Sequence, residues 1–218
     1  MDKVASAWWR LIRFGFRLLY NEMAFTYDTV STVASLGEWR CWQRAALPHL
    51  DVTNDDLILE LAHGTGNLQL DLAKAGYQAI GYDLSPYMGR IARAKLQRHG
   101  ITTRLARGKA QQLPFPAQTF KAVISTFPTD FIFAPTTLRE INRVLRDDGQ
   151  LIIVPNGELT GGGISEAGLE WLYRITGQRG ENHPPINHFF EPYGFDAILK
   201  EERCPKSIAQ VILARKKP

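Results

Sequence analysis

The chain has 218 residues, of which 44% are hydrophobic and 22% are charged, a balance typical of a globular protein and not of a disordered or fibrous one. Its net charge of +4 permits an acidic partner or an anionic membrane surface but requires neither. The sequence contains no apolar run of transmembrane length, and Arg10, Arg13 and Arg17 interrupt the stretch that could serve as a signal-peptide core, so we expect a cytoplasmic protein.

Residues 3–20 form the first predicted element, an amphipathic helix. At 3.6 residues per turn, its basic residues Lys3, Arg10, Arg13 and Arg17 share one narrow face. Tryptophan, phenylalanine and leucine side chains lie opposite, a composition typical of a helix at a membrane interface. The same pattern suits a lid that packs its apolar side on the protein. The two interpretations are compatible, and the first predicts a peripheral contact with the inner face of the membrane.

Residues 22–50 are expected to be helical, and Pro48 ends this stretch. A polar connector over residues 51–56 follows. We therefore divide the chain into an N-terminal helical cap over residues 1–50 and a second structural unit over residues 51–218.

Cys41 lies in the cap and Cys204 lies near the other end of the chain, and they are its two cysteines. They form neither a CxxC pair nor a metal-ligand spacing. We expect both to be unpaired thiols in a reducing cytosol, and we expect no metal site.

Residues 57–85 carry the most informative pattern of the chain. An apolar strand over residues 57–61 runs into Gly64 and Gly66, which allow a sharp turn and the close approach of a ligand. A helix over residues 67–75 and a second strand over residues 78–82 complete a βαβ unit. Such units bind nucleotides at the carboxyl ends of their strands.

The spacing of this loop distinguishes between nucleotides. A dinucleotide fingerprint requires a third glycine where this chain has Gln69. Glu60 in the first strand would repel a pyrophosphate, whereas it suits a ligand with an ammonium group. The alternatives are a dinucleotide-binding domain or a βαβ unit without a ligand.

An acid, a Gly-x-Gly loop and a second acid about twenty residues on resemble motif I of the class I S-adenosylmethionine (SAM) methyltransferases. The resemblance implies that Asp83 accepts hydrogen bonds from both ribose hydroxyls. Ala62 departs from the family pattern, because it replaces the first glycine. The residues that we expect to bind SAM are Tyr27, Glu60, Ala62, His63, Gly64, Gly66, Asp83, Leu84, Met88, Ala110, Gln111 and Thr126.

Three further segments resemble the ubiquinone/menaquinone C-methyltransferases, the UbiE-like group. Residues 25–44 contain its Tyr-Asp, Ser-x-Gly and tryptophan pattern, which implies that Tyr27 lies near the methionine end of SAM, the alternative being a structural aromatic residue. Residues 108–115 resemble the segment beside the adenine, although Lys109 replaces the usual acid. Residues 138–156 resemble a structural signature that supports the fold.

The family resemblance and the order of predicted elements imply an α/β, Rossmann-like fold. We expect a seven-stranded, mostly parallel sheet with helices on both faces, an antiparallel last strand and the N-terminal helical cap. Further strands are predicted over residues 102–106, 120–127, 150–155 and 208–215. A helix over residues 166–176 lies in the segment expected to determine specificity.

We expect an enzyme that transfers a methyl group from SAM to a small apolar acceptor of quinone or lipid type, leaving S-adenosylhomocysteine. Four residues are candidates for a catalytic base: Tyr27, His63, Asp130 and His188. The alternatives are a phospholipid or small-amine N-methyltransferase, and a SAM-binding scaffold or sensor without activity. Nucleic acid is not an expected substrate, because no basic patch interleaved with aromatic residues lies near the predicted strand ends. The sequence does not predict an oligomeric state.

Overall fold

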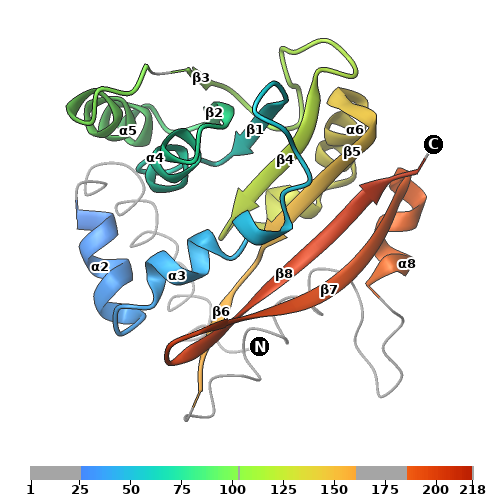
Figure 1. The fold of residues 1–218 in the computed structure, drawn as a ribbon. Coiled ribbons are helices and arrows are strands. Elements are labelled where there is room, and N and C mark those ends of the chain that lie inside the picture. Colours follow the sequence, from blue (N-terminus) through green and yellow to red (C-terminus); the bar gives the residue numbers. More distant parts are fainter. Residues whose placement is uncertain (1–25, 103, 161–185, 218) are drawn as a thin grey trace, which may run out of the picture.

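The structure is a computed structural model, and it describes residues 26–102, 104–160 and 186–217. Within these ranges, one mixed sheet forms the centre of the molecule (Figure 1). Its strands are β1 (Leu57–Leu61), β2 (Gln78–Asp83), β3 (Leu105–Arg107), β4 (Phe120–Thr126), β5 (Leu145–Val154), β6 (Gly157–Leu159), β7 (Phe195–Cys204) and β8 (Ser207–Lys216). The predicted helices over residues 3–20 and 166–176 lie outside the described residues.

The strand order is β3-β2-β1-β4-β5-β8, and both β6 and β7 also pair with β8. Strands β1 to β5 pair in parallel, whereas β8 is antiparallel to β5, β6 and β7. Strands β5 and β6 lie along the same side of β8. Strand β5 pairs with the carboxyl-terminal half of β8, and the short β6 pairs with its start. The sheet therefore has seven positions and an antiparallel last strand, which confirms the expected fold.

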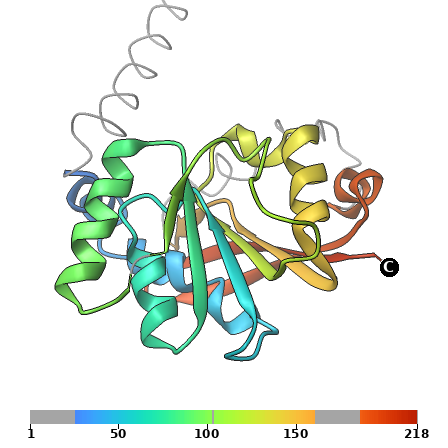
Figure 2. The ribbon, with the colours of Figure 1, turned by 90° about the horizontal axis from the view of Figure 1, so that it is seen from above.

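Helices cover both faces of the sheet (Figure 2). One face carries α4 (Asn67–Lys74) and α5 (Pro86–Arg98), and the other carries α6 (Pro135–Val144) and α8 (Asn187–Phe190). Alternate residues of each central strand enter opposite cores: Ile58 packs on the α4 side and Leu59 on the α6 side. Strands that bury both faces read as continuous apolar runs, which explains the sequences of β1, β4 and β5.

Local signals set the start of α5. The Ser85 side chain accepts a hydrogen bond from the Met88 backbone N–H and caps α5, which has Pro86 in its first turn. Strand β5 differs from the prediction, because it begins at Leu145 rather than at residue 150. Its pairing with β4 shifts register between Phe120 and Ala122, and this irregularity accommodates the polar residues 146–149.

The described part of the predicted cap, residues 26–50, contains α2 (Tyr27–Ala34), α3 (Trp39–Arg44) and the short 3-10 helix η2 (Leu47–His49). The described residues after it include two further 3-10 helices, η3 (Asp130–Phe133) and η4 (Glu191–Tyr193). Helix α3 is held from two sides. Arg40 and Arg44 both pair with Asp71 of α4, and the Trp42 indole N–H donates to the Ser207 hydroxyl at 2.8 Å. These bonds hold α3 in a fixed position against α4 and β8.

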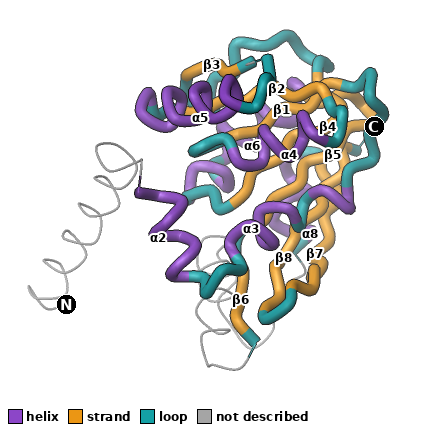
Figure 3. Tube along the Cα trace, turned by 60° about the vertical axis from the view of Figure 1, so that its left-hand side comes forward, coloured by secondary structure: helices purple, strands orange, loops and turns teal. Residues whose placement is uncertain are grey.

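A disulfide between Cys41 and Cys204 adds to this attachment, and our expectation of two unpaired thiols is wrong. The residues are separated by 163 positions in sequence, yet their Cα atoms are 6.0 Å apart. Helix α3 lies beside the β7–β8 hairpin, which brings the two cysteines together (Figure 3). Spacing along the chain could not reveal this contact, and the argument for a reducing compartment from unpaired thiols no longer holds.

The disulfide predicts a redox-dependent stability. Without reductant, Cys204→Ser should lower the free energy of unfolding by about 2 kcal/mol, at the lower end of the usual range because other bonds also hold α3. Urea denaturation with and without a strong reductant measures this, and the two proteins should differ little once both are reduced. Wild-type protein that shows two reactive thiols when denatured without reductant would contradict the pairing.

Candidate functional site

A cavity of about 560 Å³ lies at the carboxyl ends of β1, β2, β3 and β4, with α2 and α3 on its cap side. This volume is in the range of about 300–1,000 Å³ typical of small-molecule sites. The open sheet places its ligand site at these strand ends, as expected for a doubly wound fold. The residues that line it include Tyr27, Trp39, Gln43, Ala62, His63, Gly64, Thr65, Asp83, Leu84, Met88, Arg107, Lys109, Ala110, Gln111, Thr126, Phe127 and Phe131.

The loop after β1 has an unusual backbone. Ala62, Gly64 and Gly66 have φ angles of +58°, +52° and +79°, in the left-handed region that favours glycine. Ala62 therefore occupies a strained position, which explains why glycine is usual there in related loops. A Cβ added at Gly66 would lie 2.8 Å from the Ala92 Cβ, so Gly66 lets α5 pack on the loop rather than lining the cavity.

Asp83 at the end of β2 is held in place by this loop. Its carboxylate accepts a hydrogen bond from the Gly64 backbone N–H at 2.9 Å and another from the Ser85 backbone N–H at 2.7 Å. Both carboxylate oxygens are therefore oriented before any ligand binds, and each keeps a further lone pair. Among the described residues that line the cavity, Asp83 is the only carboxylate.

Glu60 is not among the lining residues, and it lies where we did not expect it. Its side chain is 1% exposed, and its carboxylate accepts a hydrogen bond from Gln69 Nε2 at 2.7 Å. Burial raises the pKa of Glu60 to about 8, and the Asp83 charge adds to the rise. Glu60 therefore holds the Gln69 side chain of α4, and its expected contact with a ligand ammonium group stays a prediction.

His63 lines the cavity and is 5% exposed. Its Nδ1 lies 2.9 Å from the Gly64 carbonyl oxygen, so Nδ1 carries the proton and Nε2 has a free lone pair. Burial lowers the pKa of His63 against the opposing effect of the Asp83 carboxylate. A neutral imidazole at this position can accept a proton.

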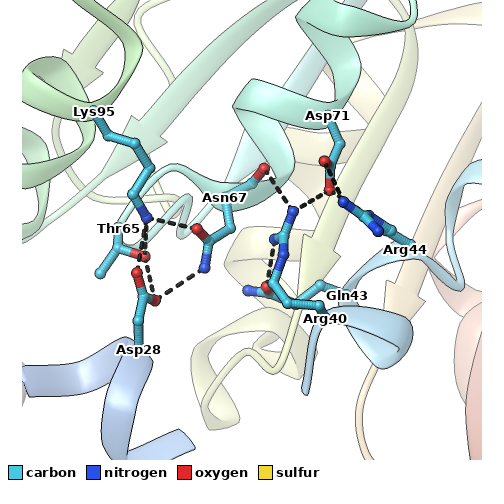
Figure 4. Close-up of polar contacts among 8 residues, drawn as sticks. All are labelled: Asp28, Arg40, Gln43, Arg44, Thr65, Asn67, Asp71 and Lys95. Atoms are coloured by element: carbon cyan, nitrogen blue, oxygen red, sulfur yellow. Dashed lines mark hydrogen bonds and ion pairs between the residues drawn. The ribbon is translucent and has the colours of Figure 1, made fainter. Parts of the chain in front are cut away.

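Tyr27 lines the cavity from the cap, and its neighbour Asp28 ties α2 to the rest of the site (Figure 4). The Asp28 carboxylate accepts hydrogen bonds from the Thr65 hydroxyl at 2.7 Å, from Asn67 Nδ2 at 2.9 Å and from Lys95 Nζ at 2.8 Å. Burial alone would raise the pKa of Asp28, but the Lys95 hydrogen bond and charge, with the other donors, hold it below its ordinary value. The glycine loop, α5 and α2 thus meet at one carboxylate.

Asp28 should therefore influence ligand binding without touching the ligand. We expect Asp28→Ala to weaken SAM binding about three- to tenfold, because one side of the glycine loop and the backbone at Tyr27 lose their support. Isothermal titration calorimetry measures the effect, with Asp196→Asn, an exposed carboxylate on β7, as the control. An Asp28→Ala protein with wild-type affinity would show that the cap does not order the site.

The remaining candidates divide into two groups. Leu84, Met88, Ala110, Gln111 and Thr126 line the cavity, and their contacts with SAM stay a prediction. Of the four catalytic candidates, the structure brings Tyr27 and His63 to the cavity. Asp130, in η3, and His188, in α8, are exposed and are not among its lining residues.

Sequence reasoning missed an aromatic side of the cavity. Trp39, Phe127 and Phe131 line it, together with Gln43. The position of Phe127 directly after a predicted strand was the available signal, whereas nothing local in the cap indicated that Trp39 faces the same space.

Two features are absent from the described ranges. No group of three or more histidine, cysteine, aspartate or glutamate residues there could hold a metal ion. No helix in the same ranges is both long enough and apolar enough to cross a membrane.

Comparisons with known proteins agree with this geometry. Residues 58–149 match a family described as "Methyltransferase domain". The chain is 32% identical over 168 residues to a demethylmenaquinone methyltransferase of Thermobifida fusca, and the match covers 72% of this chain and 70% of the relative. It is 28% identical over 144 residues to a ubiquinone/menaquinone biosynthesis C-methyltransferase UbiE of Citrifermentans bemidjiense, covering 63% of this chain and 61% of that protein.

Solved structures show the same fold. A SAM-dependent methyltransferase of Methanosarcina mazei aligns with a TM-score of 0.57 and 20% identity, covering 78% of this chain and 97% of that one. A phosphoethanolamine N-methyltransferase 2 of Haemonchus contortus, in complex with phosphomonomethylethanolamine and S-adenosylhomocysteine, aligns with a TM-score of 0.59 and 17% identity, covering 84% and 53%.

Proposed function

The chain belongs to the UbiE-like class I SAM-dependent methyltransferases, and on this basis we propose that it methylates a small quinone-type acceptor in its reduced, hydroquinone form. The observation that carries the proposal is the cavity itself, which joins an oriented carboxylate and glycine loop to an aromatic wall. The named activities of the relatives support a quinone-type acceptor.

The residues present fit SAM. A Cβ added at Gly64 would meet no atom within 4 Å, so the cavity passes directly over the loop backbone. We propose that Asp83 accepts hydrogen bonds from the ribose hydroxyls with the lone pairs that Gly64 and Ser85 leave available. Ala110 and Gln111, at the end of the cavity next to β3, are proposed to meet the adenine.

Bound SAM supplies an electrophilic methyl group, whose transfer to a ring carbon forms a C–C bond, breaks the S–C bond and leaves the electron pair on the sulfur of S-adenosylhomocysteine. The protein must hold the acceptor in line, exclude water and accept a proton. Removal of a hydroxyl proton makes the hydroquinone ring more nucleophilic. After the methyl transfer, the methylated ring carbon loses its C–H proton. We propose that His63 accepts one of these protons, because its neutral imidazole lies in the cavity.

The alternative acceptor, a phospholipid or small amine, is less well supported. An ammonium acceptor favours a nearby carboxylate, and Asp83 is the only one among the described lining residues. The resemblance to the Haemonchus structure is at 17% identity and concerns the fold alone.

We also propose that the protein meets its acceptor at a membrane surface, since an apolar quinone partitions into lipid. The exposed Val30, Val33 and Leu36, in and after α2, support this contact with exposed fractions of 46%, 69% and 67%. The predicted basic helix over residues 3–20 stays a prediction, because it lies outside the described residues.

A transfer assay tests the acceptor. The protein with methyl-labelled SAM should label a reduced naphthoquinone or benzoquinone and leave phosphoethanolamine and phosphatidylethanolamine vesicles unlabelled. Calorimetry with S-adenosylhomocysteine shows that the cofactor site is formed in the same sample. Labelling of the amines alone would overturn the quinone proposal.

A further inference from the structure

Phe127 has a backbone conformation that its sequence does not favour. It follows the last residue of β4 with a φ of +50°, in the left-handed region that bulky residues seldom adopt. Its backbone N–H donates to the Val154 carbonyl oxygen at 2.7 Å, which holds this conformation against the strain. Strained residues persist where the surrounding structure over-determines them, often at ligand sites.

The Phe127 ring is backed by the cap. Trp39 of α3 lies behind it with ring centroids 4.2 Å apart and planes inclined by 32°, and the Trp42 ring centroid lies 6.0 Å from that of Phe127. Tyr27 of α2 meets Trp39 edge to face at 6.0 Å. Trp39 is 9% exposed, whereas Phe127 is half-buried, so of the pair Phe127 is the more accessible residue.

Phe127 lies apart from Asp83, the residue that we propose binds the ribose of the cofactor. Asp83 ends β2, and Phe127 follows β4, with β1 between these strands. Adjacent strands lie about 4.8 Å apart, so the two residues are about 10 Å apart along the row of strand ends. The cavity thus has a polar side, at the ends of β2 and β3, and an aromatic side, at the end of β4.

We propose that Phe127, backed by Trp39, is the platform on which a planar aromatic acceptor lies, and that this pair determines acceptor specificity. The proposal rests on the function proposed above and names the class of ligand for this side of the cavity. A flat ring gains from offset or edge-to-face contact with Phe127, whereas a flexible chain gains only from burial of its apolar surface. Asp71 and the Cys41–Cys204 disulfide hold α3, which carries Trp39, in place. The platform is therefore formed before the acceptor binds.

Acceptor kinetics and cofactor affinity together test the platform. In Phe127→Leu, which keeps an apolar side chain but loses the ring, the KM for the reduced naphthoquinone should rise at least tenfold while the Kd for SAM stays within twofold. Phe127→Tyr should keep the KM within about threefold of the wild-type value, because it keeps the ring. Trp39→Leu should raise the KM for the reduced naphthoquinone. Trp39→Phe, which keeps an aromatic ring, should raise it much less.

A matched control and a second readout make the result decisive. Phe189→Leu removes a ring of the same size from the opposite core, and the KM should not change. Quenching of tryptophan fluorescence by an oxidised naphthoquinone measures ring binding without turnover, and Phe127→Leu should weaken it to the same extent. An unchanged KM in Phe127→Leu, or a parallel loss of SAM affinity, would overturn the platform. Ring binding that depends on Phe127 in a protein that methylates no quinol would support the platform and reject the proposed function.

Discussion

Asp83→Ala should weaken SAM binding by about 1.5–3 kcal/mol, that is roughly ten- to 150-fold. The alanine variant loses a pair of charge-assisted hydrogen bonds to the ribose and leaves the Gly64 and Ser85 backbone N–H groups without their acceptor. The loss should exceed that of Asp28→Ala, because Asp83 lines the cavity itself.

Two further measurements separate the ligand contact from the support of the loop. Asp83→Asn keeps one oxygen acceptor, so it should retain part of the affinity and most of the stability. Calorimetry gives the affinity of each variant, and thermal unfolding without ligand gives the stability. Unchanged SAM affinity in a folded Asp83→Ala protein would show that the ribose is bound elsewhere.

Glu60→Gln should make the stability of the protein markedly less sensitive to a rise in pH from about 4.5 to about 8. The pKa of Glu60 is about 8 in the folded protein, against an ordinary value of 4.5. Between these values the folded state holds a proton that the unfolded state has released, so the free energy of unfolding falls as the pH rises from about 4.5 to about 8. Each pKa unit corresponds to about 1.4 kcal/mol, so the loss is on the order of 5 kcal/mol.

The glutamine variant keeps an oxygen that accepts from Gln69 but carries no charge at any pH. Its stability relative to the wild type should therefore increase between pH 5 and pH 9, with the two proteins most alike at pH 5. Urea denaturation at pH 5, 7 and 9 measures the difference. A constant difference across this range would mean that Glu60 is ionised in the folded protein throughout.

The local sequence pattern predicted the structural features that depend on a few neighbouring residues. The turn at Gly64 and Gly66 and the carboxylate that ends β2 were both predicted, because these features depend on residues that are close together in the sequence. The parallel order of the sheet followed from the family resemblance and from the alternation of strands and helices. These features place Asp83 beside the loop without any knowledge of distant contacts.

The sequence by itself therefore determined the βαβ unit, the position of its acidic residues along the chain and, through the resemblance, the SAM-dependent activity. Only the tertiary structure decided that Glu60 is buried beneath the cavity while Asp83 lines it, since a side chain's direction at a strand end depends on what packs against it. It alone brought Cys41 to Cys204 and Trp39 to Phe127, because no local rule relates residues of the cap to strands far along the chain. These contacts attach α3 to the sheet, and they shape the half of the cavity that the acceptor is proposed to occupy.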